Sequence, residues 1–204
     1  MDRRKFLFAS TMTAIGVSAF GNVKPLGDGS FKGDCETTDD ILGPFYRANA
    51  PITSDMTYEG CSGTPIIVTG KVYSDCDDLL KDALVEIWHA NTTGEYDNES
   101  EDFRQRGRQF TDKNGQYSFK TIFPGKYLNG KLYRPAHIHF RISHKDTKEL
   151  ISQIYFQGDP EIRLDPWASQ NKAKARILPI IPQDIEGILT CLLYTSPSPR
   201  DRSL

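Results

Sequence analysis

Alternation of apolar and polar residues, which is typical of half-buried β-strands, runs through the middle of the chain. In the first such segment Ile66, Val68 and Val72 fall on one face, and Thr69 falls on the other. The same period of two predicts strands at residues 66–73, 83–90, 116–122, 137–143 and 150–156. Only residues 167–178 show a helical period, and it is weak.

Turn signals separate these segments. The sequence Asp112-Lys113-Asn114-Gly115 predicts a hairpin turn, because an Asn-Gly pair accepts positive φ angles. Many short strands with turns between them predict an all-β fold, a β-sandwich of two mostly antiparallel sheets.

Composition narrows the class of protein. The chain has 204 residues, 38% of them hydrophobic and 25% charged, which fits one globular domain and not a disordered chain or a membrane bundle. The 25 Lys and Arg residues oppose 27 Asp and Glu residues, so no basic excess predicts a nucleic-acid partner. Four Cys are too few for a disulfide scaffold, and the pairing among Cys35, Cys61 and Cys76 stays open.

The first residues differ from the middle of the chain. Arg3 and Arg4 precede a mildly apolar run that ends near Phe20, a pattern that resembles the twin-arginine export signal. We therefore expect a signal peptide at residues 1–21, followed by a linker at residues 22–33. The protein is expected to be exported, periplasmic or extracellular, with no membrane span in the mature chain.

The last residues differ as well. From Cys191 the chain is rich in Ser, Pro and Arg and resembles a translated sequencing adapter. We therefore predict that the domain spans residues 34–189 and that residues 190–204 are a non-native tail.

Candidate chemistry begins in the strand at residues 137–143. Period-two geometry puts His137, His139 and Arg141 on one face of this strand. Two His at positions i and i+2 lie ~7 Å apart at Cα, close enough for both imidazoles to reach one metal ion. The spacing alone leaves a metal site and a chance polar pair equally open.

Familiar metal sites fit this pair poorly. A cupin-like barrel needs a Glu three or four residues on, where Ser143 and His144 stand, and Glu149 is too distant. A three-His zinc site needs another His on the same face, and His89 belongs to a distant strand. A facial triad for Fe(II) needs a carboxylate in place of one His.

Two tyrosines stand just past predicted strand ends, where loops gather functional groups. Tyr96 follows the strand that ends at Ala90, and Tyr127 follows the strand that ends at Ile122. A phenolate is a hard anionic donor that suits Fe(III), and binding would depress its pKa far below ~10. For either tyrosine alone, a capping role in the core is the plainer alternative.

Several motifs follow one another in a distinctive order. They are Leu42–Tyr46, Val85–Asn91, Gly94–Asp97, Thr111–Phe119, Thr121–Tyr127 and Arg134–Phe140. In this order they resemble the intradiol ring-cleavage dioxygenases, the family of protocatechuate 3,4-dioxygenase and catechol 1,2-dioxygenase. The resemblance runs from about Leu42 to Asp159.

The resemblance implies a β-sandwich whose long loops form a mononuclear non-haem Fe(III) site. The ligands that it implies are Tyr96, Tyr127, His137 and His139. The catalytic residues that it implies are Tyr127, which also accepts a proton, Arg134, which offsets negative charge, and Gln153. His89 is expected to be a supporting or core residue and not a ligand.

The implied reaction is intradiol cleavage of a catechol-type aromatic diol by O2, giving a cis,cis-muconate-type dicarboxylate. The partners are then a small aromatic diol and O2, and a homo-oligomer is left open. Leu128 and Asn129 follow Tyr127, where protocatechuate enzymes often have a bulky aromatic residue, so the substrate within this class also stays open.

Two other functions compete with this one. Residues 69–85 resemble the transthyretin-like domains of adhesins, which predicts a non-catalytic exported binding module as the alternative. A zinc hydrolase is disfavoured because no third His or carboxylate stands at a suitable spacing. The joint presence of two Tyr and two His at the quoted positions favours the dioxygenase.

Overall fold

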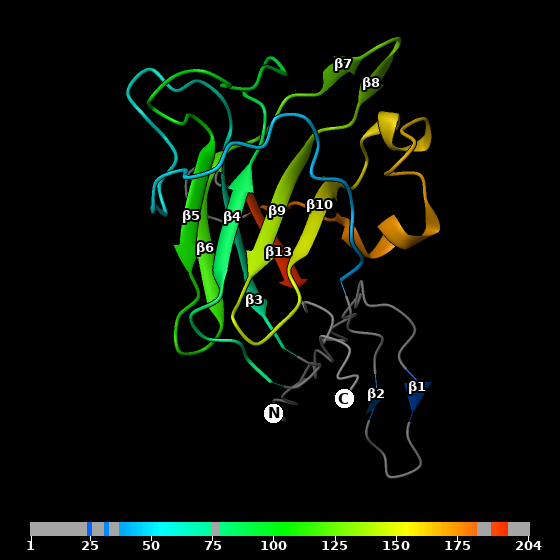
Figure 1. Ribbon diagram of the computed structural model, residues 1–204. Coiled ribbons are helices and arrows are strands. Elements are labelled where there is room, and N and C mark those ends of the chain that lie inside the picture. Colours follow the sequence, from blue (N-terminus) through cyan, green and yellow to red (C-terminus); the bar gives the residue numbers. More distant parts are fainter. Residues whose placement is uncertain (1–23, 26–30, 33–36, 75–77, 183–188, 196–204) are drawn as a thin grey trace, which may run out of the picture.

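The computed structural model describes residues 24–25, 31–32, 37–74, 78–182 and 189–195, and its two main sheets lie face to face (Figure 1). The larger sheet has the strand order β11–β10–β9–β4–β5, with bounds Ile177–Leu178, Leu150–Phe156, His137–Ser143, Leu84–Trp88 and Arg106–Phe110. The smaller sheet has the order β12–β13–β3–β6, with bounds Ile181–Pro182, Leu189–Thr195, Pro65–Val72 and Gln116–Ile122. The pairs β10–β11 and β13–β3 are parallel and the other pairs of these sheets are antiparallel, so the predicted all-β sandwich is confirmed.

The remaining elements are short. The two-stranded pairs are β1 (Lys24–Pro25) with β2 (Phe31–Lys32), and β7 (Tyr127–Asn129) with β8 (Leu132–Arg134). Two 3-10 helices, η1 (Pro160–Arg163) and η2 (Asn171–Arg176), follow β10. The weak helical pattern at residues 167–178 therefore corresponds to η2.

The core lies between the two sheets and is built from the alternating apolar positions. Ile66, Val68 and Val72 of β3 are buried as their period predicts, and Ile138 and Phe140 of β9 belong to the same cluster. Each fully buried side chain of this size contributes about 1.5–3 kcal/mol. A slip of β9 by one residue would turn these side chains outward, so the core fixes which face of β9 carries its histidines.

A segment at residues 37–46 crosses β10 on the outer side of the larger sheet (Figure 1). The amide of Asp40 donates to the Ile151 carbonyl at 2.9 Å, and Ser152 Oγ donates to the Thr38 carbonyl at 2.8 Å. This segment explains how polar side chains on the outer face of the sheet become buried.

Strand β13 crosses the predicted end of the domain. It pairs in parallel with β3 from Leu189 to Thr195, so the predicted limit at residue 189 falls at the start of a strand that continues into the tail. The non-native origin of residues 190–204 stays a prediction.

The amino-terminal predictions fall mostly outside the described residues. The predicted signal peptide at residues 1–21 lies outside them, and the predicted linker contains the short β1–β2 pair. In the described part of the chain, no helix combines the length and the hydropathy of a membrane span.

Candidate metal centre

A row of polar and aromatic residues crosses the outer face of the larger sheet. Arg106 of β5 pairs with Trp88 of β4, which pairs with His139 of β9, which pairs with Gln153 of β10. Directly paired residues share a sheet face. The row therefore places His139 between an indole and an amide, opposite the core.

The imidazole of His139 packs between the Trp88 indole and Gly43. Trp88 stacks on one side, with ring centroids 4.9 Å apart and an interplanar angle of 6°. Gly43 approaches so closely that a Cβ there would lie 2.9 Å from His139 Cε1. Burial, with smaller contributions from His137 and Arg134 themselves, holds the pKa of His139 well below its usual range, so the ring is neutral.

The nitrogens of His139 have few protein partners. Its Nδ1 atom is buried without a hydrogen bond of normal geometry, and the Ile41 backbone interacts with the ring. The ring is thus buried without a strong hydrogen bond to the protein.

His137 has a defined tautomer. Its Nδ1 atom donates to the Pro135 carbonyl at 2.6 Å, which leaves a lone pair on Nε2. Burial and the positive charge of Arg134 lower the pKa of His137 to about 3, so this lone pair is available at neutral pH. A metal-binding His commonly uses its second nitrogen in this way.

The two tyrosines meet these histidines. Tyr96 Oη donates to His137 Nε2 at 3.3 Å, and the Tyr127 ring lies 5.7 Å from the His137 ring. The Tyr96 and Tyr127 rings are 5.6 Å apart at 84°, and the His137 and His139 rings are 4.9 Å apart. Thus the structure brings all four residues into one cluster, which we call the Tyr–His cluster.

Burial favours the neutral phenol of Tyr96. Burial, with the neighbouring Tyr127 as a smaller cause, raises the pKa of Tyr96 above its usual range. A phenolate at this position would therefore need a nearby positive charge to offset its desolvation.

Two glycines hold the tyrosine loops together. Gly94 packs on the Lys126 carbonyl, and Gly125 packs on the Thr92 carbonyl. The amides of both glycines donate to the Asn91 carbonyl, at 3.1 and 2.8 Å. The loop that carries Tyr96 and the loop that leads into Tyr127 are therefore joined backbone to backbone.

We expect Gly94→Ala to destabilise the protein much more than Gly130→Ala. Both glycines have positive φ angles, +87° and +64°, so both substitutions carry a backbone cost of about 1–2 kcal/mol. Only at Gly94 would the new Cβ collide with backbone, 2.3 Å from the Lys126 oxygen, whereas nothing lies within 4 Å at Gly130. Overpacking of this kind adds about 1–3 kcal/mol.

Urea unfolding of the two variants measures this difference. Equal losses in the free energy of unfolding would show that the two loops do not need their close approach.

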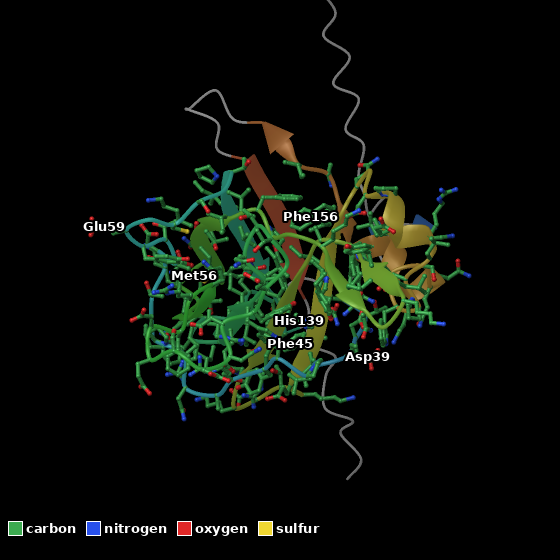
Figure 2. All side chains as sticks on the ribbon, turned by 90° about the horizontal axis from the view of Figure 1, so that it is seen from above. Asp39, Phe45, Met56, Glu59, His139 and Phe156 are labelled. Carbon is green, nitrogen blue, oxygen red and sulfur yellow. The ribbon has the colours of Figure 1, made fainter. Side chains whose placement is uncertain are left out.

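Phe45 covers the cluster. Its ring stacks on Tyr96 with centroids 4.3 Å apart and meets Tyr127 edge-on at 5.6 Å. Figure 2 labels Phe45 and His139, and both of their rings lie beside the Tyr96 ring. Arg106 holds Phe45 in place by donating to the Phe45 carbonyl at 2.6 Å and to the Asp97 carbonyl at 2.9 Å.

The two other predicted catalytic residues adjoin the cluster. Arg134 pairs with Tyr127 across the β7–β8 hairpin, and its Nη1 atom lies 3.5 Å from His137 Nε2. Gln153 is fully buried, and its Oε1 accepts from Arg134 Nη2 at 3.0 Å. Burial alone would lower the pKa of Arg134, but the hydrogen bond and charge of Asp165 raise it, so the guanidinium is charged.

His89 lies in a different setting. Its Nδ1 bonds to the Ala90 carbonyl at 2.7 Å and its Nε2 to Thr121 Oγ1 at 2.8 Å, so neither nitrogen is free for a metal. Burial lowers its pKa to about 4. These contacts agree with the supporting role that the sequence predicts for His89.

The donor set of the cluster is unusual. Among the described residues, no three or more His, Cys, Asp or Glu side chains gather into a metal-binding group. The Tyr–His cluster instead offers two neutral imidazoles and two phenols, a set of hard and borderline donors.

Comparison with known proteins identifies the family. The family model described as "Dioxygenase" matches residues 41–181, more than half of the chain. The chain belongs to the intradiol ring-cleavage dioxygenases. The resemblance seen in the sequence motifs is thereby confirmed.

Individual relatives agree with this intradiol dioxygenase assignment. A chlorocatechol 1,2-dioxygenase of Pseudomonas putida is 32% identical over 138 residues, covering 58% of this chain and 53% of that protein. The protocatechuate 3,4-dioxygenase beta chain of Burkholderia cepacia is 34% identical over 146 residues, covering 62% of each chain. The chain thus spans a little over half the length of the curated relatives that it matches.

A solved dioxygenase covers more of the fold. It is the dioxygenase domain of a dioxygenase carbohydrate-binding protein fusion from Streptomyces sp. SirexAA-E. It superposes with a TM-score of 0.70 at 26% identity, covering 80% of this chain and 98% of that chain.

Sequence reasoning missed two contacts that shape the Tyr–His cluster. The stacking of Trp88 on His139 and the ion pair of Arg134 with Asp165 had not been predicted. For Trp88 a signal was available, because β4 and β9 are both predicted strands. Nothing local marks Asp165, since its partner is 31 residues away in the sequence.

Proposed function

We propose that this protein binds one non-haem Fe(III) through Tyr96, Tyr127, His137 and His139 and cleaves a catechol-type diol with O2. The bond broken would lie between the two hydroxylated carbons, giving a cis,cis-muconate-type dicarboxylate. The observation that carries the proposal is the convergence of two phenols and two neutral imidazoles, with Tyr96 Oη 3.3 Å from His137 Nε2.

The residues present fit a ferric ion. The lone pair of His137 Nε2 points at the phenol oxygen of Tyr96, so these two donor atoms already face each other. A trivalent cation would also supply the positive charge that a phenolate at Tyr96 needs. Fe(III) bound there would act as a Lewis acid and as a template for the two diol oxygens.

Tyr127 is the residue suited to move a proton. It lies at the start of β7 and is partly exposed, with Leu128 and Asn129 beside it at the surface. Held as a phenolate by the bound ferric ion, its oxygen would take a proton from a diol hydroxyl and become a neutral phenol, whereas the Tyr96 ring is covered by Phe45.

Arg134 supplies a fixed positive charge. As the diol is oxidised, negative charge builds on the ring and on the incoming oxygen atoms. A guanidinium that is already in place in a water-poor pocket stabilises such charge without reorganisation. Gln153, hydrogen-bonded to Arg134 and to the Ile41 carbonyl, forms the wall behind it.

The alternative of a non-catalytic transthyretin-like module is not favoured. A binding module has no need of the Tyr–His cluster, and the family match covers the residues that carry it. Export to the periplasm or beyond remains part of the proposal and is supported by the twin arginines at Arg3 and Arg4.

The visible spectrum of the purified protein tests the proposed site. We expect a red-brown protein with one ferric ion per chain, because phenolate-to-Fe(III) charge transfer absorbs visible light. A colourless protein that contains zinc, or that takes up no iron when reconstituted, would overturn the assignment.

A further inference from the structure

The guanidinium of Arg134 is held on two of its three nitrogens by the protein scaffold. Nε donates to Asp165 Oδ2 at 2.8 Å, and Nη2 donates to Gln153 Oε1 at 3.0 Å and to Tyr155 Oη at 3.4 Å. Nη1 is the nitrogen that faces His137, at 3.5 Å. The scaffold therefore leaves one edge of the guanidinium for the Tyr–His cluster.

Asp165 divides its carboxylate between two tasks. Oδ1 accepts from the amides of Trp167 and Ala168 at 2.9 and 2.7 Å, which fixes the turn, while Oδ2 binds Arg134. The same turn places the Trp167 ring against the guanidinium, 4.4 Å from Arg134 Cζ. The short segment that contains Asp165 and Trp167 thus contacts the guanidinium both at its edge and on its face.

The ion pair is closed to solvent. The side chains of Arg134 and Asp165 are 3% and 1% exposed. A buried charge without its partner carries a large desolvation penalty, so an orientation that breaks this pair is strongly disfavoured.

A second buried pair fixes the other side of Arg134. Arg176 Nη1 donates to Asp40 Oδ2 at 2.6 Å and to the Gln153 carbonyl at 2.7 Å, and Tyr155 Oη donates to Asp40 Oδ2 at 3.0 Å. These contacts connect Gln153 and Tyr155, the two acceptors of Arg134 Nη2, to Asp40 in the segment at residues 37–46 and to Arg176 in η2.

We propose that Asp165, together with Trp167, positions Arg134 for catalysis by directing its Nη1 edge into the Tyr–His cluster. Asp165 touches neither the substrate nor the proposed metal and acts through Arg134. This inference rests on the proposed function, since it gives Arg134 the role of stabilising charge on the diol.

Asp165→Asn is the variant that isolates this role. The amide keeps Oδ1 as the acceptor for Trp167 and Ala168, so the turn remains capped. Its Nδ2 would replace Oδ2 and turn N–H donors toward the N–H of Arg134 Nε. The guanidinium then loses its edge partner without any change in side-chain size.

The first experiment compares Asp165→Asn with Asp112→Asn in the iron-loaded protein. Asp112 Oδ1 caps a turn in the same manner, accepting from the amides of Asn114 and Gln116, and no Lys or Arg among the described residues forms an ion pair with it. We expect Asp165→Asn to keep its iron and its KM for catechol within a few-fold and to lose about 10–100-fold in kcat, the cost typical of losing an outer partner. Asp112→Asn should leave kcat unchanged.

Trp167 provides a second variant that keeps the ion pair. Trp167→Leu removes the aromatic face and should lower kcat, and Trp167→Phe should restore most of it. Unchanged kcat in both Asp165→Asn and Trp167→Leu, in folded and iron-replete protein, would overturn the proposal.

The second experiment needs no catalysis. In Arg134→Ala, Asp165 and Trp167 form a vacant guanidinium site, which we call the holder, and this site should bind free guanidinium. About 10 mM guanidinium chloride, far below denaturing concentrations, should therefore raise the melting temperature of the variant. Urea or sodium chloride at the same concentration should leave the melting temperature of Arg134→Ala unchanged. The double variant that combines Arg134→Ala with Asp165→Asn should show no rise with guanidinium chloride.

Arg134→Ala separates the proposed function from the positioning role of Asp165 and Trp167. Full activity of Arg134→Ala would refute the catalytic use of Arg134 in the proposed function. An inactive Arg134→Ala that gains no stability from guanidinium would refute the holder formed by Asp165 and Trp167.

Discussion

His137→Ala and His139→Ala will each abolish stoichiometric iron binding while the far-UV circular dichroism remains that of a folded sandwich. Loss of a residue that merely orients a metal ligand costs about 10–100-fold in affinity, and loss of a ligand costs more. The fold should survive because both imidazoles lie on the outer face of β9, opposite the core residues Ile138 and Phe140.

Metal analysis of the purified variants measures this effect. His144→Ala is the matched control, because His144 follows the same strand and its ring accepts a local hydrogen bond from the Asp146 amide at 3.2 Å. Either variant retaining one ferric ion per chain would show that the substituted His is not a ligand.

Tyr127→Phe will keep part of its iron and lose about 10²–10⁴-fold in turnover, the range that a general base contributes. The substitution removes one oxygen atom, and the ring can keep its contacts with Phe45 and His137. Iron is partly retained because three donors remain, whereas the diol loses the group that takes its proton.

The measurement is iron content beside steady-state cleavage of catechol. Tyr133→Phe serves as the control, since Tyr133 belongs to the same hairpin but is 46% exposed and lies against Lys126. Full turnover with an unchanged visible spectrum in Tyr127→Phe would contradict the double role of this residue.

The local pattern of the chain predicts the strands and their faces well. The segments 137–143 and 150–156 coincide with β9 and β10, and the alternation in the first places His137 and His139 together on one face. Period two is reliable here because one face of each strand is buried in the core, which penalises any slip of register.

The ends of the chain were less predictable. The alternation does not extend to β13, whose pairing with β3 depends on a partner more than 100 residues away in the sequence. Parallel pairs need long connections, so their partners leave no local signal.

The residues of the functional site could also be predicted only in part. Tyr96 and Tyr127 stand 31 residues apart and were linked through motif order, while the geometry that joins them depends on Gly94 packing against Lys126. The contact of Arg176 with Asp40 spans 136 residues and could not be inferred from spacing. Such contacts belong to the tertiary fold, which composition and periodicity do not encode.

The central claim is that this protein opens a catechol ring between its hydroxylated carbons. Product analysis after incubation of the iron-loaded protein with catechol under ¹⁸O2 tests it most directly. The account predicts cis,cis-muconate that carries both labelled oxygen atoms, one in each carboxylate. A ring-opened semialdehyde, or no product from iron-replete protein with catechol, chlorocatechol and protocatechuate, would contradict it.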